Sequence, residues 1–166
     1  ITTVPLHLIE PYFNEAVIFD NSAELLNAPR LVATQEGRVL VSRNETAYVR
    51  GDVTQLRDWR LFREPKPLRD PGTNEVLGHE GQFVGTVSVT REGSDGTGAA
   101  GNTTVIPSTV TVTSIRQEAG VGDRLAPVPP RDFDNLVPHA PSQPMAGQIV
   151  SIYGESLNAG QNQIVV

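Results

Sequence analysis

The segment Gly96-Thr97-Gly98-Ala99-Ala100-Gly101 satisfies G-x-G-x-x-G, the pattern of a loop that binds the pyrophosphate of a dinucleotide. That chemistry requires the last glycine to open a helix whose N-terminus faces the phosphates. Here residues 102–107 follow, which are β-prone and end at a proline. The segment is therefore predicted to be a hairpin loop, and we expect no cofactor.

Histidines and a serine motif are the next candidates for chemistry. His7, His79 and His139 are separated by 72 and 60 positions, a spacing that indicates neither a metal pair nor a catalytic triad. Gly154-Glu155-Ser156-Leu157-Asn158 comes close to a G-x-S-x-G nucleophile elbow but lacks the closing glycine. We therefore expect no catalytic residue and no metal site.

Carboxylates offer one further route to catalysis. Two of Asp70, Glu80 and Asp123 could perform acid–base hydrolysis if the fold brought them to within about 5–10 Å of each other. Asp70-Pro71-Gly72-Thr73-Asn74-Glu75 also carries oxygen ligands, but it lacks the D-x-[DN]-x-[DN]-G order of a calcium loop. A turn on Pro71 and Gly72 between two strands explains that segment.

Composition narrows the function classes. The 166 residues carry 13 basic and 19 acidic side chains, a net charge of −6, and the arginines are scattered along the sequence. Because phosphate neutralisation needs a concentrated basic face, we expect no nucleic-acid partner. The chain has no Cys, which excludes disulfides, thiolate catalysis and Cys-based zinc sites. No apolar run approaches the roughly 20 residues of a membrane-spanning helix.

The elements that would position these residues are predicted to be strands. Apolar residues make up 38% of the chain and aromatic residues 5%, so the core is expected to be aliphatic. Short β-branched or aromatic runs at 38–42, 46–50 and 58–62 predict three strands in a meander. Residues 16–19 predict a short buried strand, and Ser22 is a candidate cap for one helical turn ending before Pro29.

The clearest alternation of apolar and polar residues runs from Phe83 to Thr90 and predicts a half-buried strand. In it Phe83 and Val87 share one face, and Val84 lies on the other. Residues 109–113 are its expected partner, with a β-bulge at 114–115 that restores the register. The small, polar segment 93–102 between them is predicted to be a hairpin loop.

Six prolines lie between Pro127 and Pro144, and this density is incompatible with either a helix or a paired strand in that segment. We expect four parts: a lead-in at 1–30, a strand-rich domain at 31–127, an extended connector at 128–146, and the start of a second β unit at 147–166. The predicted fold class is all-β, a small antiparallel sheet or barrel-like domain with a proline-rich connector to a second β unit. A strand at 163–166 leads us to expect further sequence after it.

Seven stretches are more specific than any motif above: Asn27-Ala28-Pro29-Arg30-Leu31-Val32-Ala33, Thr46-Ala47-Tyr48-Val49-Arg50-Gly51, Trp59-Arg60-Leu61-Phe62-Arg63, residues 68–78, Val121-Gly122-Asp123-Arg124-Leu125, Pro138-His139-Ala140-Pro141 and residues 147–154. Together they resemble the region that follows the LysM domain in exported LysM-containing proteins of Gram-negative bacteria. The resemblance extends from about residue 25 to the end of the chain.

This resemblance implies a periplasmic, cell-envelope protein that is associated with peptidoglycan through a LysM module. The 166 residues contain no LysM-type repeat, so none of that module's sugar-binding residues can be assigned here. Most of the shared residues are expected to have structural roles. Gly51 and Gly78, for example, are expected at positions where strands reverse with a positive φ. Trp59 and Phe62 are expected on opposite faces of one strand, one in the core and the other covered by the lead-in or exposed. If exposed, Trp59 or Tyr48 is our candidate for stacking on a sugar ring.

The preferred hypothesis is therefore a non-catalytic accessory β region of a peptidoglycan-associated envelope protein, with an envelope protein as a further candidate partner. The first alternative is a protein- or peptide-binding adaptor of the envelope, which would use an edge strand or the P-x-x-P connector. The second is a cell-wall hydrolase built on two of the carboxylates named above. The sequence leaves these alternatives open.

Overall fold

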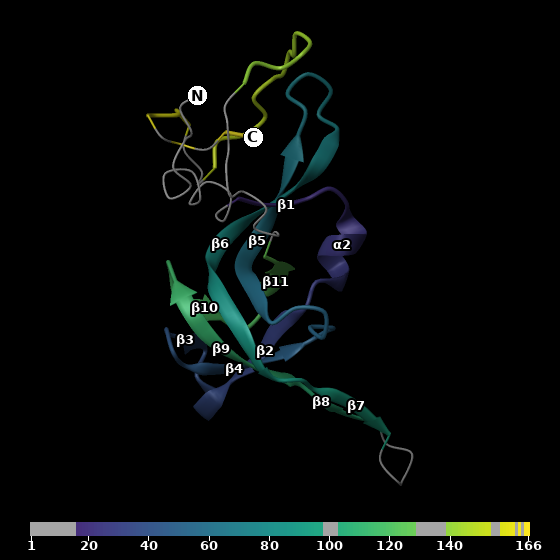
Figure 1. The fold of residues 1–166 in the computed structure, drawn as a ribbon, viewed down its shortest axis with the longest axis vertical. Coiled ribbons are helices and arrows are strands. Elements are labelled where there is room, and N and C mark those ends of the chain that lie inside the picture. The colour runs from purple at the N-terminus through teal and green to yellow at the C-terminus, as the bar shows by residue number, and fades with distance from the viewer. Residues whose placement is uncertain (1–15, 98–102, 129–138, 154–156, 162, 164) are drawn as a thin grey trace.

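The computed structural model describes residues 16–97, 103–128, 139–153, 157–161, 163 and 165–166. Six antiparallel strands close into a barrel, and the all-β prediction is confirmed (Figure 1). Around the barrel the order is β6, β5, β11, β2, β4 and β9, which returns to β6. The strands are β1 (Ala16–Phe19), β2 (Arg30–Thr34), β3 (Leu40–Val41), β4 (Thr46–Arg50), β5 (Asp58–Arg69), β6 (Val76–Arg91), β7 (Ser94–Thr97), β8 (Thr103–Ile106), β9 (Ser108–Ile115), β10 (Ala119–Gly120) and β11 (Arg124–Pro127).

The barrel interior is filled by side chains, as small barrels generally are. Alternate residues of each strand point inward, so the sequence supplies one apolar side chain to the interior at every second position. Twelve of the thirteen buried residues in this cluster are aliphatic, as the composition predicted, and the other is Trp59. They are Leu31, Val41, Ala47, Val49, Val53, Trp59, Leu61, Val84, Val87, Val110, Val112, Ala119 and Leu125.

Two bulges curve the strands that close the barrel. Phe62 lies opposite Phe83 and Leu61 opposite Gly85, so Val84 is an extra residue in β6. On the other side of β6, the register shift to β9 leaves Thr113 extra, one residue before the predicted bulge. The expected partnership of these two strands is confirmed. The predicted alternation is wrong at its start, because the first bulge turns Val84 inward beside Val87.

A second apolar cluster lies on the outer surface of β5. Phe62 packs there against Phe19 of β1, with ring centroids 4.8 Å apart. The predicted strand at 16–19 is thus confirmed, and Trp59 and Phe62 do lie on opposite faces of one strand. The short helix α2 (Ser22–Asn27) contributes Leu25 to the cluster. Asn21 rather than Ser22 caps this helix, accepting a hydrogen bond from the Glu24 N–H at 2.8 Å.

The predicted meander of three strands is wrong. Strand β3 pairs with β10, β4 lies between β2 and β9, and β5 lies between β6 and β11. Sequence patterning locates a strand but carries little information on which strand lies beside it. Only residues 42–45 separate β3 from β4, yet these two strands do not pair, and the loop 51–57 separates β4 from β5.

The segment between β6 and β9 contains more regular structure than predicted. Instead of one loop over 93–102, strands β7 and β8 pair over four residues each and form a ribbon that projects from the barrel (Figure 1). Residues 98–102, which include Gly98 and Gly101 of the G-x-G-x-x-G segment, lie outside the described residues. Only Gly96 and Thr97 of that motif are described, and both lie within strand β7.

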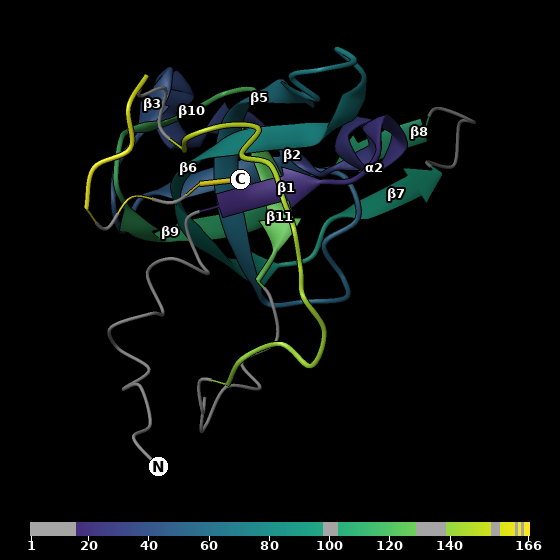
Figure 2. The same cartoon turned by 90° about the horizontal axis from the view of Figure 1, so that it is seen from above.

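The C-terminal part lies beside the outer surface of the long hairpin β5–β6 (Figures 1 and 2). The predicted strand at 148–153 is reduced to one antiparallel bridge between Ile152 and Val165. Residues 139–146 of the proline-rich connector form no strand, as expected, and most of that connector (129–138) lies outside the described residues. In the described part of the chain, no helix has the length and apolar character needed to cross a membrane.

Gly51 confirms the prediction of positive φ, whereas Gly78 does not. Gly51 follows β4 with φ of 122°, and a Cβ there would lie 2.7 Å from Cα of Pro29. Gly78 lies inside β6 rather than at a reversal, opposite Leu68. Position 78 has no room for a larger residue, because a Cβ there would approach the Phe19 carbonyl oxygen to 2.8 Å. Close packing of β1, and not a turn, explains that glycine.

We predict that Gly51→Ala lowers the free energy of unfolding by at least about 2 kcal/mol, because it adds a steric clash to an unfavourable φ. Gly37→Ala has a matched positive φ of 68° with nothing within 4 Å, and should lose only about 1 kcal/mol. Gly147→Ala, with open space and no positive φ, is the neutral control. Urea unfolding curves measure all three, and equal losses for Gly51→Ala and Gly37→Ala would contradict the role of the contact with Pro29.

Candidate functional site

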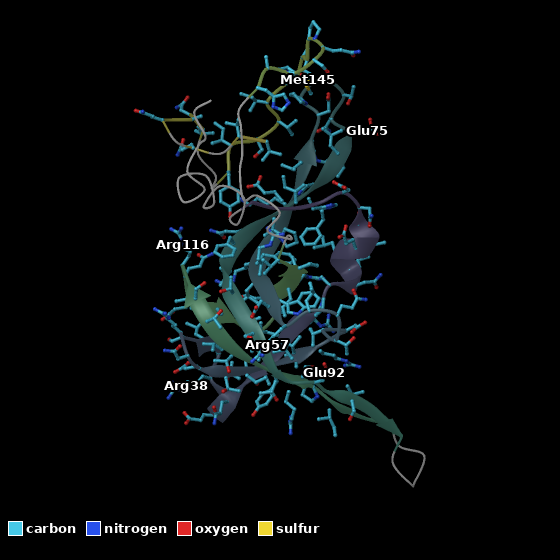
Figure 3. All side chains as sticks on the ribbon, in the orientation of Figure 1. Arg38, Arg57, Glu75, Glu92, Arg116 and Met145 are labelled. Atoms are coloured by element: carbon cyan, nitrogen blue, oxygen red, sulfur yellow. The ribbon has the colours of Figure 1, made fainter. Side chains whose placement is uncertain are left out.

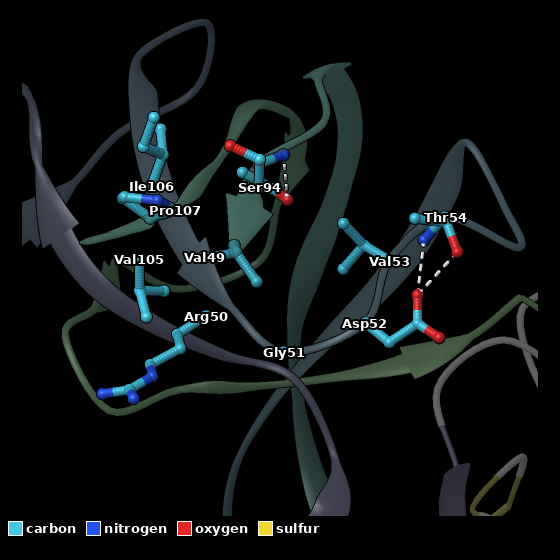
Figure 4. A pocket seen from close by; sticks show the side chains of 12 residues that line it. Val49, Arg50, Gly51, Asp52, Val53, Thr54, Ser94, Val105, Ile106 and Pro107 are labelled. Carbon is cyan, nitrogen blue, oxygen red and sulfur yellow. Dashed lines mark hydrogen bonds between the residues drawn. The ribbon is translucent and has the colours of Figure 1, made fainter. Parts of the chain in front are cut away.

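A groove of about 610 Å³ lies where the projecting ribbon leaves the barrel (Figure 4). Its residues come from the end of β4, from the loop after it, and from the base of the ribbon. Strand pairing positions them: Val49 of β4 lies opposite Ser108 of β9, and the Ser108 hydroxyl accepts a hydrogen bond from the Gly93 N–H at 2.8 Å. The lining residues are Val49, Arg50, Gly51, Asp52, Val53, Thr54, Gly93, Ser94, Val105, Ile106, Pro107 and Ser108.

The groove has an apolar side and a polar side. Val49 and Val53 belong to the barrel core and form its floor. Val105 and Ile106 of β8 form an apolar wall, and they keep 37% and 45% of their surface exposed. Exposed aliphatic side chains next to an open groove are typical of a binding surface, although single exposed aliphatics also occur commonly elsewhere.

The polar side carries one carboxylate and one guanidinium. Asp52 Oδ1 accepts hydrogen bonds from the Thr54 hydroxyl at 2.7 Å and from the Thr54 N–H at 3.0 Å, and these bonds hold the pKa of Asp52 below its usual value. Figure 4 shows the Arg50 and Asp52 side chains extending to opposite sides of Gly51. Neither Thr54 nor Ser94 has a histidine or a lysine beside it among the lining residues. The arrangement suits binding rather than nucleophilic attack.

The structure places the two candidate stacking residues differently. Trp59 lies inside the barrel with 5% of its surface exposed, and its indole Nε1 donates to the Leu56 carbonyl oxygen at 2.9 Å. This is the environment of a core residue, which leaves no ring face for a sugar. Tyr48 is half-buried on the outer surface of β4 and lies two residues before Arg50. Tyr48 as a sugar contact stays a prediction.

Two of the three candidate acids have structural roles. Asp70 begins the tight turn between β5 and β6, where its Oδ1 accepts from the Thr73 N–H at 2.7 Å and the Gly72 N–H at 2.8 Å. These bonds hold its pKa below the usual value, and they confirm the predicted turn. The six described residues 70–75 form this turn without a metal-ligand cluster.

Asp123 is buried in the turn before β11 and forms a bidentate ion pair with Arg63 of β5, at 2.6 and 2.7 Å. Its Oδ2 also accepts from the Gly120 N–H at 2.7 Å, while Arg63 donates to the Glu118 carbonyl oxygen at 2.8 Å. The pair therefore joins β5 to the β10–β11 turn. The spacing of 60 residues between the partners gave no signal of this contact in the sequence.

Glu80, the third acid, lies on β6 opposite Lys66 of β5. Burial raises its pKa, although a hydrogen bond from the Ser151 hydroxyl at 3.3 Å and the charge of Lys66 act in the opposite direction. Two residues after Ser151, the Tyr153 hydroxyl oxygen accepts from the Phe83 N–H at 2.9 Å. These contacts attach the C-terminal segment to β6. Glu80, Asp70 and Asp123 share no hydrogen-bond partner.

Two of the three histidines, His79 and His139, are among the described residues. His79 lies on β6 next to Glu80, and its Nδ1 is buried without a hydrogen-bond partner in the described structure. Among the described residues no three His, Cys, Asp or Glu side chains gather as a metal site would need. His7 lies outside the described residues.

No protein-family model matches the chain, and neither does any curated protein.

The raised pKa of Glu80 leads us to expect that the stability of the fold depends on pH. An acid with a raised pKa in the fold binds its proton more tightly there than in the unfolded chain, so stability should fall as pH rises above its ordinary pKa of 4.5. Glu80→Gln should flatten that fall and be more stable than the wild type at pH 7, with the difference vanishing near pH 4. Urea midpoints between pH 4 and 7 measure this, with Glu75→Gln, at the exposed residue labelled in Figure 3, as the charge-matched control. An unchanged slope in Glu80→Gln would contradict the prediction.

Replacing Asp123 is expected to lower the stability of the fold strongly. Asp123→Asn leaves the Arg63 guanidinium without its counter-ion, and we expect a loss of about 3 kcal/mol in the free energy of unfolding. Asp52→Asn removes the same charge from an exposed loop, where water screens it, and should lose clearly less than Asp123→Asn. Chemical denaturation of both variants makes the comparison. Equal losses would show that charge alone, and not the buried pair, sets the stability.

Proposed function

We propose that this chain is a non-catalytic β-barrel module of an exported, periplasmic protein of the cell envelope. In this proposal, peptidoglycan is held by a LysM module outside these 166 residues. The barrel then acts as an accessory region that supports or extends the peptidoglycan-bound protein. Its partner would be another envelope protein, and the groove beside β8 is the surface that would receive it.

The location of the shared stretches supports this proposal most strongly. Residues 27–33 include most of β2 and also Pro29, which lies against Gly51. Residues 46–51 comprise β4 and the glycine after it, and residues 59–63 lie in the first half of β5. Residues 121–125 include Asp123, which pairs with Arg63. Four of the seven stretches that carry the resemblance thus build the barrel, as expected for a shared scaffold rather than a shared active site.

The surroundings of the acids support a non-catalytic role over a hydrolase. A glycosidase requires an unpaired acid and a second carboxylate on the opposite side of the scissile bond. Asp70 is engaged by turn N–H groups and Asp123 by Arg63 and Gly120. Glu80 alone combines burial with a raised pKa, and its hydrogen-bond donor is a serine of the C-terminal segment.

Sedimentation with purified Gram-negative peptidoglycan tests the proposal. The chain by itself should remain in the supernatant, whereas the same chain joined to a LysM module should pellet. Pelleting of both proteins to the same extent would overturn the assignment of affinity to the missing module. Soluble muropeptides should not be released above the level of a no-protein control. Release that disappears in Glu80→Gln would overturn the non-catalytic assignment.

A further inference from the structure

Three arginines that are far apart in the sequence lie in one row across the barrel. Arg124 of β11 lies opposite Arg30 of β2, and Arg30 lies opposite Arg50 of β4. Residues directly opposite in neighbouring strands point to the same face of a sheet, with Cβ atoms about 4.5–5.5 Å apart. Each arginine precedes or follows a core residue, since Leu31, Val49 and Leu125 point inward. The three guanidinium groups therefore share the outer face.

The pairing of Arg30 with Arg124 brings these side chains especially close. Its flanking hydrogen bonds run from the Leu31 N–H to the Asp123 carbonyl oxygen at 2.8 Å and from the Leu125 N–H to the Pro29 carbonyl oxygen at 2.7 Å. Bonds in those positions mark a non-hydrogen-bonded pair, the closer of the two antiparallel types, with Cα atoms about 4.5 Å apart. Like charges in such a pair repel each other.

The row contains more positive charge than its surroundings neutralise. Among the residues that the structure describes, the guanidinium groups of Arg30 and Arg50 make no hydrogen bond and no ion pair. Arg124 donates through Nη1 to the Leu25 carbonyl oxygen at 2.6 Å, a neutral acceptor that leaves its other donors available. Two acids lie close to the row in sequence. Asp123 precedes Arg124 but is paired with Arg63, and Asp52 is bonded to Thr54 and extends away from Arg50 (Figure 4).

The geometry points to a binding site for a small molecule that carries two or more neighbouring oxyanion groups. The side chains of Arg124, Arg30 and Arg50 would bind these groups. Guanidinium groups offer paired donors that match either a phosphoryl group or a carboxylate. Arg124 is half-buried beside the apolar cluster of Phe62 and Leu25, where screening by water is weaker than at a fully exposed surface. Arg50 extends the row to the groove that it also lines. This inference does not rest on the proposed function.

Isothermal titration of the full chain at low salt tests the site with two probes, tripolyphosphate and citrate. Saturable binding of tripolyphosphate alone assigns phosphoryl groups, and binding of citrate alone assigns carboxylates. Arg30→Gln should weaken binding of the active probe by at least about tenfold, since it removes the central charge-assisted contact. Arg30 is exposed, so its replacement should leave the fold intact, which the urea midpoint checks.

Arg91→Gln is the matched control, because it removes the same charge from an exposed position at the end of β6, outside the row. It should change the dissociation constant by less than about twofold. Arg30→Lys should lie between the wild type and Arg30→Gln, since it keeps the charge but loses the paired donors. Absence of binding to both probes, or equal weakening by Arg30→Gln and Arg91→Gln, would overturn the proposal.

Discussion

Strand β6 pairs with three other strands, and the rest of the structure depends on that arrangement. One part of it binds β1, almost its whole length pairs with β5, and its second half binds β9. The bulge at Val84 makes this geometry feasible, because an extra residue bends the strand and increases its twist. The bend closes the sheet into a barrel and brings Val84 and Val87 together in the core. Without it, β9 would be an open edge.

The closed barrel has two different surroundings on its outer surface. On one side, β1 and α2 cover Phe62 and create a second apolar cluster. On the opposite, inward face of β5, the ion pair between Arg63 and Asp123 fixes the β10–β11 turn against that strand. Where β1 and α2 cover the outer surface of the barrel, side chains such as Phe62 pack against them. The uncovered outer surface of β2 and β4 is left to Arg30, Arg50 and Tyr48, and this is where the candidate ligand contacts lie.

Local signals predicted much of the secondary structure. The strands at 16–19, 46–50 and 109–113 were located correctly, since β-branched runs between turn residues specify a strand locally. The opposite orientation of Trp59 and Phe62 followed from the period of two. The pairing of β6 with β9 was also predicted, but the neighbours of the other strands, the bulge at Val84 and the role of Gly78 could not be. Each of these depends on which backbone approaches from elsewhere in the chain.

The sequence by itself determined an all-β, aliphatic, acidic chain in which the arginines are scattered. The tertiary structure alone decided that Arg30, Arg50 and Arg124 form one row. The physical reason is register. Residues 20 and 94 positions apart become neighbours only when strand pairing sets them opposite each other, and a shift of one residue would have turned each of them to the other face of the sheet. The same pairing buried Trp59 and left Tyr48 on the outer surface.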